Sequence, residues 1–170
     1  MIRSKLAGAA LTVLLAATLG ACAKPVAEPA KPVVDTAKVA DTVKADVRQM
    51  IADFNAHDAA KAVTHDAPDY VGMFHGLPNV KGVAEDLELT KQQLADTSSK
   101  IDVADEVVDV AASGDMAVYR ATYTYGFTDP KTKAATTETG NWVMGYKAQP
   151  DGALKLAWGV VSDTGAAPAK

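Results

Sequence analysis

The spacing of apolar residues changes along the chain, and each change predicts a different kind of element. Residues 6–19 are almost all apolar or small. From Thr36 to Phe54 the apolar residues recur every three or four positions, which predicts an amphipathic helix with Asp35 or Thr36 as its N-cap. From residue 99 onward, apolar and polar residues alternate, as is typical of half-buried strands. The chain therefore predicts helices followed by a sheet.

Two shorter helices and a strand are expected between these regions. A turn at residues 55–58 leads to a short helix that ends near His65. Pro68 is expected to close this helix, and residues 70–74 are expected to form a strand. A third helix is predicted at residues 82–94, where one face carries Val83, Leu87, Thr90 and Leu94.

The alternating region predicts four strands, at residues 101–110, 116–127, 136–147 and 154–160. Alternation slips near Asp105 and Glu106, which predicts a β-bulge. Successive strands have faces that carry Tyr119, Ala121, Tyr123, Tyr125 and Phe127, then Trp142, Met144 and Tyr146, and last Leu154, Leu156, Trp158 and Val160. Helices that precede a curved, mainly antiparallel sheet indicate the α+β class.

Three stretches of this region resemble a known family. Residues 54–87, 113–125 and 151–163 resemble the SnoaL-like domains of the nuclear transport factor 2-like superfamily, and the resemblance extends over residues 39–163. It implies a cone in which three N-terminal helices pack on a curved, mainly antiparallel sheet, with a pocket between helices and sheet. The expected domain is 35–165, followed by a loose tail at 166–170. The resemblance says little about function, because the fold hosts enzymes and binding modules alike.

The N-terminal segment indicates export. Arg3 and Lys5 precede the apolar run, which is shorter than the roughly 20 residues that span a bilayer. The run ends in Leu-Gly-Ala-Cys, which resembles the lipobox of bacterial lipoproteins, in which the Cys22 thiol receives a diacylglycerol group. We therefore expect a signal peptide at 1–21 and a membrane anchor at Cys22. The residue after Cys22 is Ala23 and not Asp, which indicates transport to the outer membrane, where the anchored protein would face the periplasm.

Residues 22–34 are expected to form a spacer, because three prolines favour extended polyproline II structure there. Cys22 is the only cysteine, so no intramolecular disulfide can form. The chain has a net charge of −4, and loss of residues 1–21 would remove two basic residues and no acidic one. An acidic protein is not attracted to phosphate groups, which argues against nucleic acid as a partner.

Metal and cofactor chemistry are not expected. His57 and His65 lie near opposite ends of the predicted short helix, about 12 Å apart along its axis, and cannot share one ion. Ketosteroid isomerases share the fold, and the resemblance places Met50, Phe74 and Trp142 at their catalytic positions. None of these side chains takes a proton, so that activity is not expected.

The candidate site lies at the mouth and floor of the expected pocket. His75 follows the first strand, where a neutral imidazole could act as a base or contact a ligand. Trp142 and Trp158 are expected to face the pocket, because both lie on apolar strand faces. The predicted ligand-binding residues are His75, Trp142, Trp158, Tyr123 and Glu138. The tyrosine stripe that contains Tyr123 has two further interpretations, core packing and a dimer contact.

Three functions stay open on this basis. The first is a membrane-anchored lipoprotein that binds a small molecule in its pocket. The second is an isomerase or lyase that uses His75 with a tyrosine or Glu138. The third is a scaffold that binds a partner protein, or a second copy of itself, through its sheet face.

Overall fold

The computed structural model describes residues 33–164, and the proposed signal peptide, Cys22 and most of the spacer lie outside them, as does the tail. Helix α1 (Thr36–Asn55) begins where predicted, because the Asp35 side chain accepts a hydrogen bond from the Lys38 amide at 3.0 Å. Its buried stripe comprises Val43, Val47, Met50 and Phe54. None of the helices in residues 33–164 is both long and apolar enough to span a membrane.

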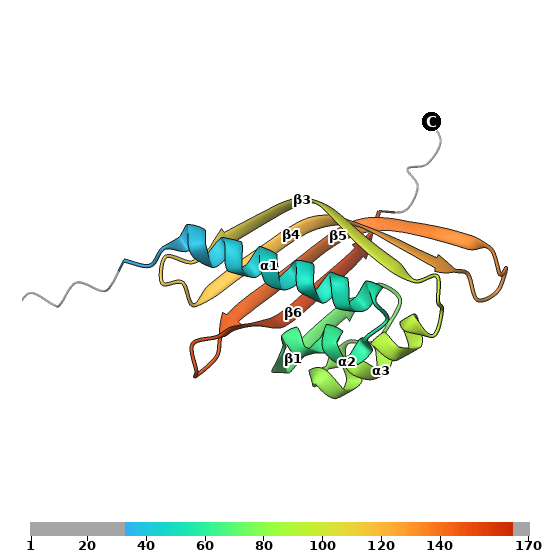
Figure 1. Cartoon of the computed structure of the whole chain (residues 1–170), viewed down its shortest axis with the longest axis horizontal. Coiled ribbons are helices and arrows are strands. Elements are labelled where there is room, and N and C mark those ends of the chain that lie inside the picture. Colours follow the sequence, from blue (N-terminus) through green and yellow to red (C-terminus); the bar gives the residue numbers. More distant parts are fainter. Residues whose placement is uncertain (1–32, 165–170) are drawn as a thin grey trace, which may run out of the picture. The chain divides into compact units, whose positions relative to one another are not determined.

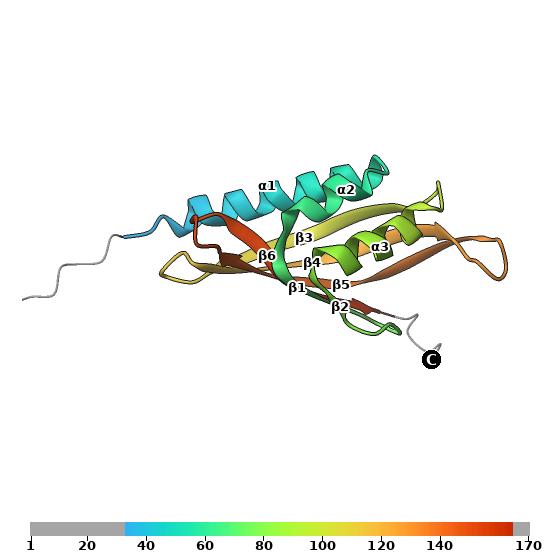
Figure 2. The same cartoon turned by 90° about the horizontal axis from the view of Figure 1, so that it is seen from below.

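Two further helical segments follow, as the sequence predicts. Helix α2 (Ala59–Ala62) is capped by Asp58, whose side chain accepts from the Lys61 amide, and it runs into a short 3-10 turn, η1 (Val63–His65). Helix α3 (Gly82–Leu94) starts where Glu85 reaches back to accept from the Lys81 amide at 2.7 Å. All three helices lie on the same face of the sheet (Figures 1 and 2).

The described residues form one six-stranded sheet with the order β2-β1-β6-β5-β4-β3. The strands are β1 (Asp66–Phe74), β2 (Val80–Lys81), β3 (Lys100–Val110), β4 (Met116–Thr128), β5 (Ala135–Ala148) and β6 (Leu154–Asp163). All neighbouring pairs are antiparallel except β1 with β6, which are parallel. The fold is thus the expected α+β arrangement of helices packed on a curved, mainly antiparallel sheet.

The first strand differs from the prediction. β1 begins at Asp66, so Pro68 lies inside the strand and does not close the preceding helix. The pairing of β1 with β6 is interrupted between Asp66 and Val71. Proline has no amide hydrogen to donate to a ladder, and this gap in the pairing accommodates it. The strand therefore includes Asp66, which is buried.

Two register shifts determine which side chains face the helices. β3 shifts between Ala104 and Val107, at the bulge that the sequence predicts, and Asp105 adopts a positive φ of 57°. β6 also shifts: Tyr146 pairs with Leu156, but Gly145 pairs with Trp158. One extra residue in β6 therefore reverses the side-chain alternation after Leu156.

The prediction of a single apolar face on β6 is therefore wrong for its second half. Directly paired residues of neighbouring strands share a face of the sheet. Leu156 pairs with Tyr146 and faces the helices, whereas Trp158 pairs with Gly145 and faces the other side. The Trp158 ring covers Gly145 so closely that a Cβ atom there would overlap ring atom Cε2.

The core lies between α1 and the helix-facing side of the central strands. Its largest fully buried side chains are Tyr119, Tyr146, Met144, Val43 and Val47. The tyrosine stripe of β4 faces this interior, with Tyr119 fully buried and Tyr123 5% exposed. The stripe therefore supplies core packing at one end and, at the other, the wall of the cavity described below.

The position of Trp158 predicts an asymmetry between two strand glycines that share the outer face. Gly145→Ala should lower the free energy of unfolding by about 1–3 kcal/mol, because the added methyl group overlaps the Trp158 ring. Gly126→Ala, on neighbouring β4, should change it little, because nothing lies within 4 Å of an added Cβ there. Urea denaturation of both variants measures the difference. Equal stabilities would contradict the placement of Trp158.

Candidate functional site

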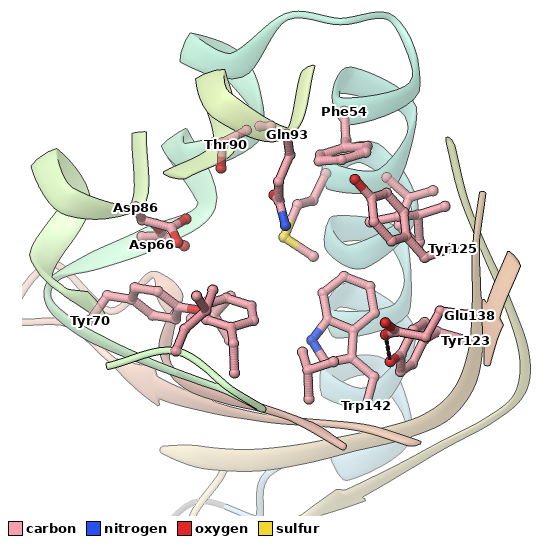
Figure 3. A pocket seen from close by; sticks show the side chains of 18 of the residues that line it. Phe54, Asp66, Tyr70, Asp86, Thr90, Gln93, Tyr123, Tyr125, Glu138 and Trp142 are labelled. Carbon is pink, nitrogen blue, oxygen red and sulfur yellow. Dashed lines mark hydrogen bonds between the residues drawn. The ribbon is translucent and has the colours of Figure 1, made fainter. Parts of the chain in front are cut away.

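A cavity of about 260 Å³ lies between the helices and the sheet. Its walls come from α1, α2, α3 and every strand except β2 (Figure 3). Most of the lining is apolar or aromatic, and Met50, Phe54, Tyr70, Phe74, Trp142 and Leu156 contribute to it. Small-molecule sites are typically concave, mainly apolar and equipped with a few polar groups, and this cavity has that character.

One group of polar side chains lies at the exposed edge of the cavity and comprises His75, Glu138 and Tyr123, here called the rim cluster. His75 Nε2 lies 3.4 Å from Glu138 Oε2, and the Tyr123 hydroxyl donates a hydrogen bond to Glu138 Oε1. The His75 side chain is 42% exposed, whereas Tyr123 is buried. Burial and the contact with Glu138 raise the pKa of Tyr123, which therefore keeps its proton at neutral pH.

Four of the five predicted ligand-binding residues lie together on this side of the cavity. His75, Tyr123 and Glu138 come from three different segments and meet in the rim cluster. Trp142, which follows Glu138 on β5, lies beside them with its ring directed into the cavity (Figure 3). Trp158 does not line the cavity, because the register shift in β6 places it on the outer face.

A second polar group, which the sequence analysis does not identify, lies across the cavity and consists of Asp66 and Asp86, here called the carboxyl pair (Figure 3). Asp66 is the first residue of β1 and is only 7% exposed. No donor in residues 33–164 reaches its Oδ2 atom. The neighbouring Asp86 carboxyl is close enough to raise the pKa of Asp66, and a hydrogen bond between the two groups would need a proton on one of them.

The environment of the carboxyl pair favours the protonated form. Burial, reinforced by the neighbouring Asp86 carboxyl, raises the pKa of Asp66 to about 8. Burial raises the pKa of Asp86 to about 6. Two carboxylates in one apolar site cannot both ionise easily, so the pair holds about one proton at neutral pH.

The signal for the carboxyl pair is present in the sequence, although the apolar pattern obscures it. Asp86, Thr90 and Gln93 follow at spacings of four and three, so they form a polar stripe on α3. All three line the cavity. The predicted apolar face of this helix already includes Thr90, but its centre lies on Val83, Leu87 and Leu94, so the pattern does not place Asp86 and Gln93 in the interior.

A network next to the cavity holds the helices against the sheet. Asp46 of α1 accepts a hydrogen bond from the Tyr146 hydroxyl at 2.9 Å and lies 2.7 Å from His65 Nδ1. His65 Nε2 is 3.7 Å from Asp53, also on α1. The hydrogen bond to Asp46 raises the pKa of His65. These contacts occupy His65, and within residues 33–164 no group of three or more His, Cys, Asp or Glu side chains is arranged to hold a metal ion.

This geometry supports two kinds of chemistry. The carboxyl pair can donate or accept a proton, or bind a group that donates hydrogen bonds, in a site shielded from water. The rim cluster offers an imidazole 3.4 Å from a carboxylate at a place that solvent reaches. The aromatic walls between the two groups would contact an apolar ligand body.

Comparison of the sequence with protein-family models and with curated proteins finds no match. Solved structures do match. A nuclear transport factor 2-like superfamily protein from Salmonella enterica serovar Typhimurium aligns with a TM-score of 0.64 at 14% identity, covering 79% of this chain and 99% of its own. A ketosteroid isomerase-like protein from Erwinia carotovora atroseptica aligns with a TM-score of 0.62 at 18% identity, and the match covers 74% of this chain and 96% of its own.

A provisionally assigned dehydratase of the nuclear transport factor 2-like family, from Streptomyces avermitilis, gives a TM-score of 0.65 at 16% identity, covering 76% of this chain and 99% of its own. At these identities the likeness shows the fold and not the activity. The chain therefore has the nuclear transport factor 2-like fold, as the sequence resemblance implies, and its chemistry has to be argued from its own cavity.

The carboxyl pair makes stability depend on pH in a direction that can be measured. The ordinary pKa of Asp66 is 3.8, and the folded value is about 8. Between these values the folded protein binds a proton that the unfolded chain does not, so the free energy of unfolding falls as pH rises from about 4 to 8, by at most about 1.4 kcal/mol per pH unit. Asp66→Asn should remove much of this slope and stabilise the protein at pH 8.

Thermal melts at pH values from 5 to 9, about one unit apart, would test this. The quantity compared is the difference in melting temperature between the variants at each pH. Asp69→Asn is the matched control, because Asp69 lies on the same strand but is exposed. The pKa of His65 is also raised, so His65 also makes the protein less stable as pH rises. Because both variants keep His65, this contribution cancels when they are compared. Identical pH profiles for the Asp66 and Asp69 variants would contradict a buried, protonated pair.

Proposed function

We propose that this protein binds a mainly apolar small molecule in the cavity of its nuclear transport factor 2-like domain. The observation that carries the proposal is the cavity itself: about 260 Å³, walled by aromatic and aliphatic side chains, with polar groups on two sides. A filled interior would have favoured a scaffold. Polar groups at separate places in an apolar cavity fix the orientation of a ligand, which is how such sites achieve specificity.

The membrane anchor belongs to the same proposal and rests on the sequence. The apolar run and the Leu-Gly-Ala-Cys junction support lipid attachment at Cys22, in the periplasm at the outer membrane. A single acyl chain binds membranes only marginally, whereas two or more hold a protein stably. A tethered domain with an apolar cavity would meet ligands that leave or enter the membrane.

A second candidate function is proton-transfer catalysis of the isomerase or lyase type. The rim cluster favours it, because the Glu138 carboxylate contacts both an imidazole and a phenol at the edge of the cavity. His75 would act as the base and Glu138 would orient it. The provisionally assigned dehydratase and the ketosteroid isomerase-like protein among the structural neighbours suggest the same direction by analogy alone.

Filling the cavity should abolish binding of an apolar probe. Thr90→Phe places a ring in the cavity from α3, whereas Lys91→Phe places the same ring on the exposed side of the helix. The probe is N-phenylnaphthylamine, which is uncharged, and energy transfer from tryptophan reports its binding to protein. The expected result is at least about tenfold weaker binding for Thr90→Phe only, since the ring displaces the apolar surface that the probe covers. Unchanged binding in both variants would show that the probe does not enter the cavity.

The anchor is tested separately. Cys22→Ser removes the thiol that would carry the lipid, so metabolic labelling with a radioactive fatty acid should be lost. Cell fractionation should then find the variant in the soluble fraction, or in the membrane fraction with its apolar run still uncleaved. Retention of the fatty-acid label by the Cys22→Ser variant would show that Cys22 is not the lipid attachment site.

A further inference from the structure

We propose that Asp66 and Asp86 form a subsite for an organic ammonium group, so that the preferred ligand is an apolar amine bound with its nitrogen between the two carboxyl groups. The inference rests on the proposed small-molecule function and names its ligand class. The pair lies on one side of the cavity, where β1 begins and α3 completes its first turns (Figure 3).

The unpartnered oxygen of Asp66 is the first argument. Asp66 is 7% exposed and lines the cavity, and no donor in residues 33–164 reaches its Oδ2 atom. A buried acceptor that lacks a donor destabilises the folded protein, so this atom needs a donor from water, from the proton shared with Asp86 or from a bound molecule. An ammonium group carries several N–H donors and could reach Asp66 and Asp86 together.

The charges around the cavity are the second argument. Its lining contains three acidic residues, Asp66, Asp86 and Glu138, and neither Lys nor Arg among the described residues. Lys155 of β6 acts on Asp66 from outside the lining, but its Nζ donates to the Thr64 carbonyl at 2.6 Å. An anionic ligand would therefore meet only like charges and one histidine, whereas a cation would meet carboxylates.

The other titratable groups near the pair are negative, neutral or already engaged. Asp46 faces it from α1 and adds negative charge. Tyr70 on β1 and Tyr146 on β5 are influenced by the pair, and burial raises the pKa of both, so they stay neutral. His65, which precedes Asp66, is engaged by Asp46.

The aromatic walls are the third argument. Tyr70 lies beside the carboxyl pair, and Phe54 and Trp142 face the same space (Figure 3). Aromatic rings attract cations through their π-electrons, most strongly where water is excluded. They also accommodate the apolar body that carries the ammonium group.

Binding of an ammonium group has a proton balance that distinguishes it from binding of a neutral molecule. With a pKa of about 8 for Asp66 and about 6 for Asp86, the empty pair holds roughly one proton at pH 7. When the cation enters, this proton leaves for the solvent, and both carboxylates accept N–H hydrogen bonds from the ligand. Affinity for the amine should therefore rise with pH, by at most about tenfold per pH unit between pH 6 and 8.

The test compares three probes with one body and different charge: phenylbutylamine, phenylbutanol and phenylbutyrate. Each is titrated against N-phenylnaphthylamine bound to the full chain in lipid nanodiscs, with empty nanodiscs as the blank. The amine should displace the dye at a concentration roughly ten to a hundred times lower than the alcohol, and phenylbutyrate should be weakest. Only the amine should bind more tightly as pH rises from 6 to 8, a window set by the Asp66 and Asp86 values.

Matched variants assign the effect to the pair. Asp66→Asn and, independently, Asp86→Asn should reduce amine affinity by at least about tenfold while changing alcohol affinity by less than about threefold. Glu88→Gln removes one negative charge from the exposed side of α3 and should leave all three affinities unchanged. Because two variants are used, a failure of one to fold leaves the other to decide.

Each other outcome contradicts a specific statement. Equal affinity for amine and alcohol, tighter binding of phenylbutyrate, or an amine affinity that does not change with pH would overturn the ammonium subsite and leave the proposed binding function intact. Failure of the dye itself to bind would overturn the proposed function, and the subsite with it.

Discussion

Asp46 on α1 joins the helical layer to the sheet beside the cavity. Its two carboxylate oxygens bind different elements, since one accepts from the Tyr146 hydroxyl of β5 and the other faces His65 Nδ1 of η1. Hydrogen bonds to a charged group contribute about 1.5–3 kcal/mol each, more than neutral ones. The residue after His65 is Asp66, so the contact that holds η1 against α1 also fixes where the first strand begins and where its carboxyl group lies.

The same constraint explains why the two polar groups of the cavity differ in character. Asp66 of the carboxyl pair directly follows the segment that Asp46 fixes, and burial raises the pKa of both carboxyl groups so that the pair keeps a proton. The rim cluster lies near the open end, where His75 is 42% exposed and Glu138 26%. One group is thus shielded and protonated while the other is accessible to solvent, and a ligand that bridges them would have polar ends of different kinds.

The sequence predicted the architecture well because that architecture depends on periodic burial. The stripe on α1, the bulge at Asp105 and the inward tyrosines of β4 all follow from patterns of period 3.6 or 2. The rim cluster was predictable for the same reason, because the strand parity that places Trp142 inward also places Glu138 inward. Whether these residues bind a ligand was not predictable, since burial patterns alone do not distinguish cavity walls from packed core.

Two features of the sheet are not predicted by the sequence because they interrupt the regular pattern of a strand. The extra residue in β6 is not visible in the alternating pattern, so the pattern predicts Trp158 on the inner face although it covers Gly145 on the outer one. The sequence predicts that Pro68 ends a helix, whereas the gap in the β1–β6 pairing lets it stand inside a strand. A strand predicted to begin after Pro68 excludes Asp66, so the sequence pattern does not place this carboxyl group in the sheet.

The family resemblance and the cavity agree on shape and differ in chemistry. The positions that the resemblance assigns to ketosteroid isomerase catalysis are Met50, Phe74 and Trp142, and all three line this cavity. These three cavity positions therefore carry no side chain that transfers a proton at neutral pH. The titratable side chains of this cavity come instead from the beginning of β1, from α3 and from the first part of β5. A fold of this kind fixes a concave space, and which wall carries the proton-binding groups is decided by a few residues that the fold does not constrain.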